Sequence, residues 1–232
     1  MMPFMFMPFD PLYLYLVLPT MLLAMLAQMR VSSSFKKYSK DRTRRGITGA
    51  EAARQILRSA GINDVKIERA QGHLSDHFDP RANVIRLSES VHDKQTIAAI
   101  GVAAHEAGHA IQYATHYAPI KLRMAILPAT SFGSKLAMPL VLIGLIFEMT
   151  GLINIGILLF GAVVVFQLLT LPVEFNASRR AIAAVREIGL LAEDELPGAK
   201  RVLSAAALTY VGALAVSLAQ LLRLMMIANR RR

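Results

Sequence analysis

The sequence predicts a mainly α fold: a polytopic α-helical membrane protein with about four spans and a small α+β domain. Three observations lead to this prediction. Apolar residues make up 54% of the 232 residues, whereas charged residues make up only 18%. The apolar residues gather in long runs, each close to the roughly 20 residues that cross a bilayer as a helix. A polar region with helical and strand-like patterns separates the first run from the others.

The first predicted span is PLYLYLVLPTMLLAMLAQM, residues 11–29, in which Pro19 should produce a kink that a membrane helix tolerates. No basic segment precedes this span and no small-residue cleavage site follows it. Residues 1–30 are therefore expected to be a retained transmembrane anchor rather than a signal peptide that is removed. Residues 30–46, RVSSSFKKYSKDRTRRG, are rich in Lys and Arg. The positive-inside rule places them in the cytoplasm and the N-terminus outside.

Residues 31–122 are expected to form a soluble cytoplasmic domain. Thr48 is followed three residues later by Glu51, which is the pattern of a capping box at the start of a helix. Gly61 stands where that helix should end. The segment therefore predicts a helix of about three turns.

Two strands and a longer helix should follow in the same domain. The segments 65–70 (VKIERA) and 83–88 (NVIRLS) are typical of strands. The next segment predicts a helix over about 91–117, with Ser88 or Ser90 as its N-cap.

Two further spans are predicted over about 132–149 and over 152–173. Their connection around Gly151 is short, so we expect residues 123–173 to form an antiparallel transmembrane hairpin.

Residues 174–201 are polar and helix-forming, and we expect them to be a cytoplasmic segment. Residues 202–232 should form a last span, over about 202–227, and a basic tail that ends in Arg230–Arg232. Four spans from an outside N-terminus place this tail outside, against the charge rule. Either the last segment does not cross, or the first loop outweighs the tail, which we favour.

The net charge of +10 does not point to nucleic acid, because most of the excess lies beside apolar spans. The expected partners are the lipid bilayer and a protein or peptide substrate, and the oligomeric state is left open. The chain has no cysteine, which excludes disulfides, cysteine–zinc sites and a cysteine nucleophile.

The segment VAAHEAGHAIQ, residues 102–112, carries the chemistry. His105 and His109 are four residues apart, so in a helix they share one face and can bind one Zn²⁺. Glu106 lies about 100° around the helix and can act as general base on a zinc-bound water. The composition gives about 0.006 chance matches to H-E-x-x-H. We therefore expect a zincin-like catalytic domain.

Zinc needs a third protein ligand. His116 lies on the same stripe of the helix but about 10 Å past His109. The motif H-E-x-x-H-x-x-G-x-x-H, in which a third histidine binds the zinc, is absent. It needs Gly at 112 and His at 115, where this sequence has Gln112 and Thr115. Glu174 is the preferred ligand, since two spans return the chain to the membrane face of the histidines. The alternative for Glu174 is a carboxylate that stabilises a helix start.

With LPVEFNASRRA and DHFDPRANVIRLS, the motif resembles the YugP-like membrane zinc metallopeptidases of bacteria, the neutral zinc metallopeptidase family. The resemblance covers nearly the whole chain and implies a peptidase of the bacterial plasma membrane with a site that faces the cytoplasm. A more distant likeness to HtpX-type peptidases aligns Glu174 with their E-x-x-x-D helix. Ser178 then replaces the Asp that orients a ligating histidine, and Asn176 is its rival for that supporting role.

Several other residues also have predicted roles. His73 and His77 form a second pair in an apparent turn, where hydrogen bonding is the simpler role. His77 could instead approach the cleft and stabilise the oxyanion. The strand 83–88 could be the cleft edge on which an extended substrate adds. Gly108 is expected at a close contact.

Gly156 and Gly161 suit tight helix packing in lipid.

The sequence thus predicts a membrane-embedded zinc endopeptidase with one Zn²⁺ per chain, bound by His105, His109 and Glu174, with Glu106 as the base. One alternative is an intramembrane site-2-type protease, although no D-G motif is present. Another alternative is a non-catalytic membrane scaffold stabilised by metal, for which Glu106 would have no use.

Overall fold

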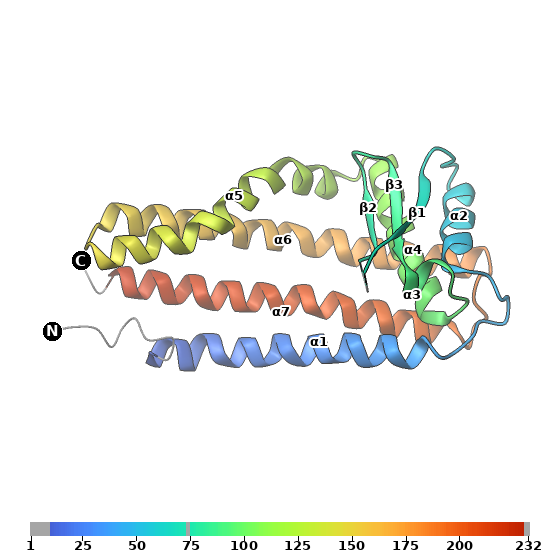
Figure 1. Ribbon diagram of the computed structural model, residues 1–232, viewed down its shortest axis with the longest axis horizontal. Helices are drawn as coiled ribbons and strands as arrows, with labels where there is room; N and C mark the ends of the chain where they lie inside the picture. Colours follow the sequence, from blue (N-terminus) through green and yellow to red (C-terminus); the bar gives the residue numbers. More distant parts are fainter. Residues whose placement is uncertain (1–9, 73–74, 230–232) are drawn as a thin grey trace. The chain divides into compact units, whose positions relative to one another are not determined.

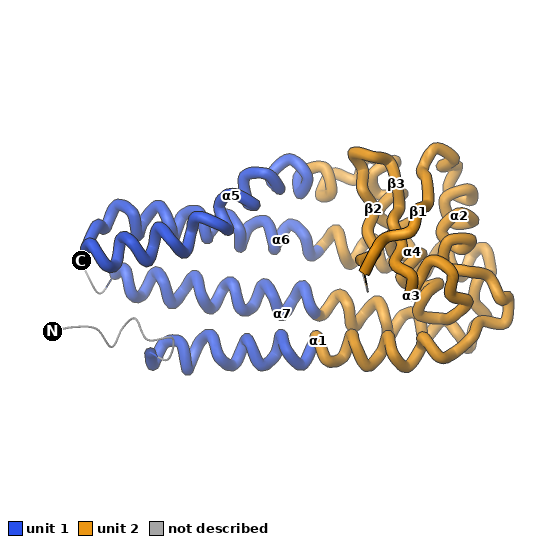
Figure 2. Tube along the Cα trace, viewed as in Figure 1, with its two compact units in different colours: residues 1–27, 122–171, 209–232 blue, residues 28–121, 172–208 orange. Residues whose placement is uncertain are grey.

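The computed structural model describes residues 10–72 and 75–229. Most of the first ten residues of the predicted anchor, His73 and the arginines of the tail therefore lie outside the described residues. The chain divides into two compact units, which Figure 2 draws in different colours. Unit 1 comprises residues 1–27, 122–171 and 209–232, and unit 2 comprises residues 28–121 and 172–208.

Four long helices dominate the described chain: α1 (Leu18–Tyr38), α5 (Ala118–Ile146), α6 (Thr150–Glu187) and α7 (Leu196–Asn229). Each is long and apolar enough to cross a membrane. The structure thus confirms a mainly α fold with four candidate spans and a small α+β part. A π-helical turn η2 (Tyr13–Val17) precedes α1, just before Pro19, whose missing N–H disturbs the regular hydrogen-bond pattern.

Helix packing within unit 1 depends on one of the two glycines singled out above. A Cβ atom on Gly156 would lie 2.5 Å from Cγ2 of Val141, so α6 and α5 meet closely there, as predicted. A Cβ atom on Gly161 would have no neighbour within 4 Å among the described residues of other elements, so the prediction of a tight contact at that position is wrong. Gly161 lies about 140° around the helix from Gly156 and faces away from α5.

A three-stranded sheet lies in unit 2, in the order β1 (Lys66–Ala70), β3 (Val84–Ser88), β2 (His77–Asp79) (Figure 1). β1 pairs with β3 in parallel, and β2 pairs with β3 antiparallel. Since β3 has a neighbour on both sides, the prediction that residues 83–88 form a free cleft edge is wrong. The edge strand beside it, β2, is only three residues long and was expected to be a turn.

Helix α2 (Gly49–Ser59) begins with the predicted capping box. The Thr48 hydroxyl accepts a hydrogen bond from the Glu51 N–H at 3.2 Å, and the Glu51 carboxylate accepts one from the Thr48 N–H at 2.7 Å. Gly61 follows the helix end with φ of +74°, a conformation that favours glycine. α2 contacts the motif helix, and Ile56 is fully buried in the core they share.

The helix predicted over about 91–117 is in fact two helices, α3 (Glu89–His92) and α4 (Ile97–Ala114). Ser88 precedes α3 but makes no side-chain capping bond. The cap of the motif helix is Thr96, whose hydroxyl accepts a hydrogen bond from the Ala99 N–H at 3.4 Å. The polar run Asp93–Thr96 separates the two helices because Thr96 bonds the first turn of α4 and starts a new helix there.

Candidate metal centre

The two histidines of the motif lie one turn apart on α4, a helix that is mostly buried in unit 2. Their rings meet edge to face, with centroids 4.6 Å apart. The Nε2 atoms are 3.2 Å from one another. Both rings therefore present the same kind of nitrogen to one point, as the spacing of four residues predicted.

Glu174 brings a carboxylate oxygen to that point from α6. Its Oε2 atom lies 3.2 Å from Nε2 of His105 and 3.5 Å from Nε2 of His109. Glu174 is only 2% exposed. His105, His109 and Glu174, the donor cluster, are the His, Asp or Glu group among the described residues that could hold a metal ion.

The spacing of the donor cluster fits a zinc ion. Tetrahedral zinc bonds of about 2.0–2.1 Å place neighbouring ligand atoms about 3.3 Å apart. The three separations here are 3.2, 3.2 and 3.5 Å. Two imidazoles and one carboxylate also form a donor set that suits zinc and leaves a fourth position open.

Gln112 supports this geometry from one turn further along α4, and it was not singled out from the sequence. The side chain is fully buried. Its amide nitrogen donates to the Val173 carbonyl at 2.8 Å and to Oδ1 of Asn176 at 2.9 Å. Its oxygen Oε1 lies 3.1 Å from Nδ1 of His109. Since the oxygen can only accept, Nδ1 of His109 must carry the hydrogen, which leaves Nε2 with a lone pair for a metal.

Ser178 supports the other histidine. Its hydroxyl lies 3.1 Å from Nδ1 of His105. Asn176, the rival residue, reaches the site only indirectly, because its Oδ1 accepts from Gln112 and from Nε of Arg180 at 2.8 Å. The two residues therefore hold different positions: Ser178 contacts His105, whereas Asn176 contacts the partner of His109.

The chain is similar to known proteins over most of its length. Residues 13–229 match the family described as "Putative neutral zinc metallopeptidase". The chain belongs to this family. The chain is also 48% identical over 216 residues to "Putative membrane protease YugP" of Bacillus subtilis (strain 168). The aligned region covers 93% of this chain and 96% of the relative. No solved structure matches.

Glu106 follows His105 directly on α4, and it is 7% exposed. Its carboxylate makes no hydrogen bond to another described residue. An unpaired carboxylate beside the donor cluster is available to accept a proton from a water molecule there.

The charges of the site act on His109. Burial of the ring disfavours its protonated form, but the hydrogen bond to Glu174 and the negative charges of Glu106 and Glu174 outweigh burial and raise the pKa of His109. The same carboxylates that attract a proton to this ring would attract a divalent cation, so the two compete.

Helices α4 and α6 meet at a close contact beside the donor cluster. A Cβ atom on Gly108 would lie 2.6 Å from the Ala177 carbonyl oxygen. The structure thus confirms that Gly108 occupies a close contact. Ala177 is one turn after Glu174 on α6, so this contact sets the distance between the helices that carry the donors.

Two other histidines considered above lie elsewhere. His77 is exposed on β2, with Nδ1 2.8 Å from the Ser75 carbonyl. It is not a member of the donor cluster, and its role in stabilising an oxyanion stays a prediction. His116 follows the end of α4 with φ of +54° and is also outside the cluster.

Proposed function

We propose that this protein is a membrane-embedded zinc endopeptidase that binds one zinc ion through His105, His109 and Glu174. The observation that carries the proposal is the donor cluster itself, with three donor atoms 3.2–3.5 Å apart and a carboxylate beside them. Membership of the zinc metallopeptidase family supports the same conclusion.

Glu106 acts as the general base in this proposal. His105, His109 and Glu174 would hold the zinc ion, which would supply Lewis acidity to a bound water and to the scissile carbonyl. Glu106 accepts a proton from the attacking water as the water oxygen bonds to the carbonyl carbon. The same carboxyl then gives the proton to the leaving amine as the C–N bond breaks. Gln112 and Ser178 hold the two imidazoles in orientation throughout.

The sheet supports an internal cleavage site. β2 is paired on one side only among the described strands, and it contacts the motif helix through Phe78, whose ring centroid is 5.9 Å from that of Tyr113. An extended peptide that adds to β2 would make main-chain hydrogen bonds along its length. Such binding does not need a chain terminus, and this favours an endopeptidase.

The proposed location is the bacterial plasma membrane, with the catalytic site on the cytoplasmic side. Seven of the residues from 30 to 46 are Lys or Arg, and they follow the first candidate span directly. The positive-inside rule favours the cytoplasm for this segment. The segment belongs to unit 2, the unit that holds the donor cluster.

The test compares the full-length protein in detergent with its Glu106→Gln variant. The wild type should hold about one zinc per chain and cut an unfolded protein such as casein at internal bonds. Glu106→Gln should keep zinc and lose about 10²–10⁴-fold in cleavage rate, because only the base is lost. Glu187→Gln, which removes an exposed carboxylate on α6, is the control and should match the wild type.

Two outcomes would contradict the proposal. Cleavage by Glu106→Gln at the wild-type rate would remove Glu106 from the mechanism. A wild-type protein that holds zinc but cuts no unfolded protein would support the alternative of a metal-stabilised scaffold.

A further inference from the structure

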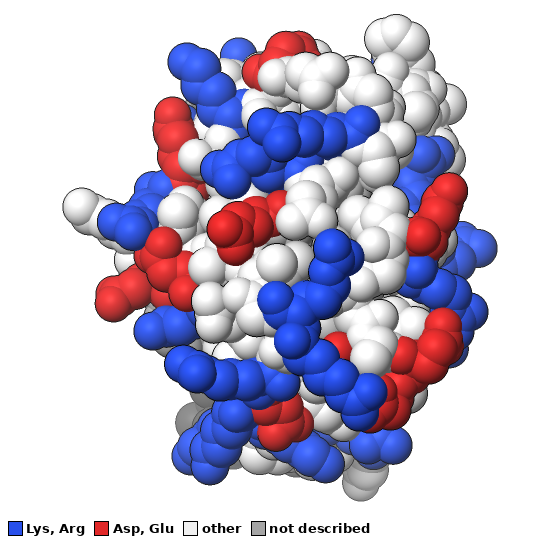
Figure 3. Space-filling model, turned by 90° about the vertical axis from the view of Figure 1, so that its right-hand side faces the viewer, with Lys and Arg blue, Asp and Glu red and all other residues white. Residues whose placement is uncertain are grey.

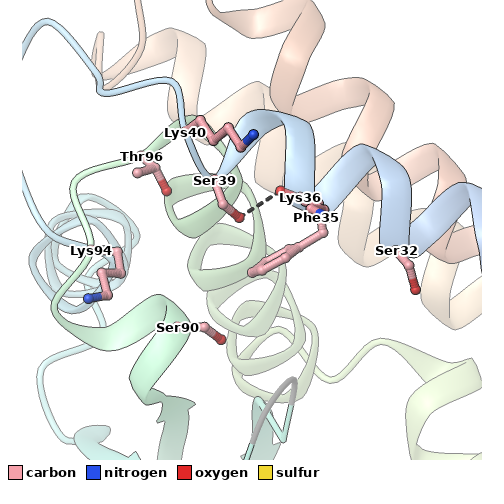
Figure 4. A pocket seen from close by; sticks show the side chains of 8 residues that line it. All are labelled: Ser32, Phe35, Lys36, Ser39, Lys40, Ser90, Lys94 and Thr96. Carbon is pink, nitrogen blue, oxygen red and sulfur yellow. Dashed lines mark hydrogen bonds between the residues drawn. The ribbon is translucent and has the colours of Figure 1, made fainter.

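Unit 2 contains a second feature, a cavity of about 500 Å³ whose lining includes none of the donor residues (Figure 4). This volume is within the range of about 300–1,000 Å³ that holds small ligands. Its lining combines cationic side chains, Lys36, Lys40 and Lys94, with hydroxyl groups and the ring of Phe35. No carboxylate lines it.

The three lysines of the cavity come from separate parts of the chain. Lys36 lies in the last turn of α1, and Lys40 lies in the turn that follows its end at Tyr38. Lys94 lies in the connection between α3 and α4. The fold therefore brings a third positive charge to two that are already neighbours in sequence.

These charges are not neutralised by the described part of the protein. None of the three ammonium groups lies within 4.0 Å of a described carboxylate, whereas Asp93, the neighbour of Lys94, pairs with Arg69. Positive charges that line one cavity repel one another, and the arrangement gains stability when an anion binds there.

A solvated cationic surface is the simpler alternative, and the lining of the cavity weighs against it as a full account. On the face drawn in Figure 3, Lys and Arg are spread widely, with Asp and Glu among them. The lysines of the cavity differ in that they line a hollow without any acidic group. Its hydroxyl groups include that of Thr96, which accepts from the Ala99 N–H and still has its own hydrogen to donate.

The position of the cavity along α1 indicates what the anion is. The exposed apolar side chains of this helix end with Met29, which is 51% exposed, and Arg30 follows. Lys36 is six residues beyond Arg30, about 9 Å along the helix. The polar headgroup layer extends about 5–8 Å beyond the hydrocarbon core on each side, and a lysine side chain can reach back into it.

We propose that this cavity binds the phosphate of an anionic phospholipid at the membrane surface. Lys36, Lys40 and Lys94 neutralise the headgroup, and the hydroxyls of Thr96 and Ser32 donate to its oxygens. The Ser39 hydroxyl already donates to the Phe35 carbonyl at 2.6 Å, as Figure 4 shows, so it offers its lone pairs to headgroup hydroxyls. Phe35 is 6% exposed and forms an apolar wall.

The experiment measures lipid retention on the full-length protein in detergent by native mass spectrometry. Phosphatidylglycerol, phosphatidylcholine with the same acyl chains and soluble glycerol phosphate are added in separate samples. The wild type should retain phosphatidylglycerol at least about fivefold more than phosphatidylcholine, since one lysine near a membrane surface contributes about that factor. Replacing Lys36, Lys40 and Lys94 together by Gln should abolish the preference.

Two matched variants control for charge and folding. Replacing Lys37, Lys66 and Lys121 by Gln removes the same charge from exposed positions outside the cavity and should leave the preference intact. Replacing the three lysines of the cavity by Arg should also keep it. The proposal is overturned if the Gln variant of the cavity retains phosphatidylglycerol like the wild type. It is also overturned if soluble glycerol phosphate occupies the site as well as the lipid does at equal concentration.

Discussion

Nδ1 of His109 lies 3.1 Å from Oε1 of Gln112, one turn along the same helix. Because the Gln112 amide nitrogen is held by two acceptors on α6, its oxygen must face the ring. A buried amide on the motif helix thus fixes which imidazole nitrogen is free for a metal.

Gln112→Leu should weaken zinc binding by about 10–100-fold, the usual effect of removing a partner that orients a ligand. Titration of the purified protein with a competing chelator measures this affinity. A cobalt-substituted sample distinguishes orientation from folding, since its visible absorption reports the ligand geometry. An unchanged cobalt spectrum and unchanged affinity would show that Gln112 does not position His109.

Glu174→Ala should lower zinc affinity by more than the roughly 10–100-fold expected for a supporting residue, because it removes a donor atom. The bound zinc per chain, measured after dialysis, should fall well below one. Glu187→Ala lies on the same helix and is exposed, so it should keep the wild-type content. Full zinc and full activity in Glu174→Ala would mean that the third ligand lies elsewhere.

Gly108→Ala should destabilise the protein by about 1–3 kcal/mol, the usual cost of overpacking. The new Cβ would lie 2.6 Å from the Ala177 carbonyl oxygen, so α4 and α6 must separate, and zinc affinity should fall as well. Thermal unfolding and zinc content measure the two effects.

Gly101→Ala provides the comparison on the same helix. Its Cβ would lie 3.4 Å from the Ala199 side chain, an ordinary contact, so this variant should unfold no earlier than the wild type. Equal behaviour of the two variants would contradict the role of the close contact at Gly108.

Glu51→Gln should reduce stability at pH 7 by about 0.3–1 kcal/mol, the typical range for an exposed charge at a helix N-terminus. Hydrogen bonds from the Thr48 N–H and hydroxyl, with Arg54 nearby, lower the pKa of Glu51 below its ordinary 4.5. The contribution is therefore present above pH 4.5 and is lost as the pH falls through the lower folded-state pKa.

Thermal unfolding of wild type and Glu51→Gln at a series of pH values checks this. The difference in unfolding temperature between the two proteins should shrink in acid. Glu187→Gln should unfold at the same temperature as the wild type at every pH. A gap that stays constant down to the lowest pH would rule out the carboxylate as its source.

Local patterns predicted much of the fold. The capping box at Thr48, the four apolar runs and the shared face of His105 and His109 each depend on residues close in sequence. Glu174 was a long-range prediction, and it depended on counting two spans between the histidines and the carboxylate. The structure brings these residues together, while their binding of zinc stays a prediction.

The features that were not predicted depend on weak local patterns or on contacts between residues far apart in the sequence. The role of Gln112 requires Val173 and Asn176 on another helix, although its place three residues after His109 was a usable signal. β2 was missed because three residues carry no clear alternation. The start of α4 at Thr96 was missed because a serine nearby was also an acceptable cap.

The order of the donor cluster along the chain has a consequence for biosynthesis. His105 and His109 leave the ribosome before α5, and Glu174 leaves it only after most of α6. A nascent chain therefore carries two donor atoms, without the third, until all of α5 and most of α6 have been made. A protein synthesised in this order has a complete donor set only after most of the third of its four candidate spans has been made.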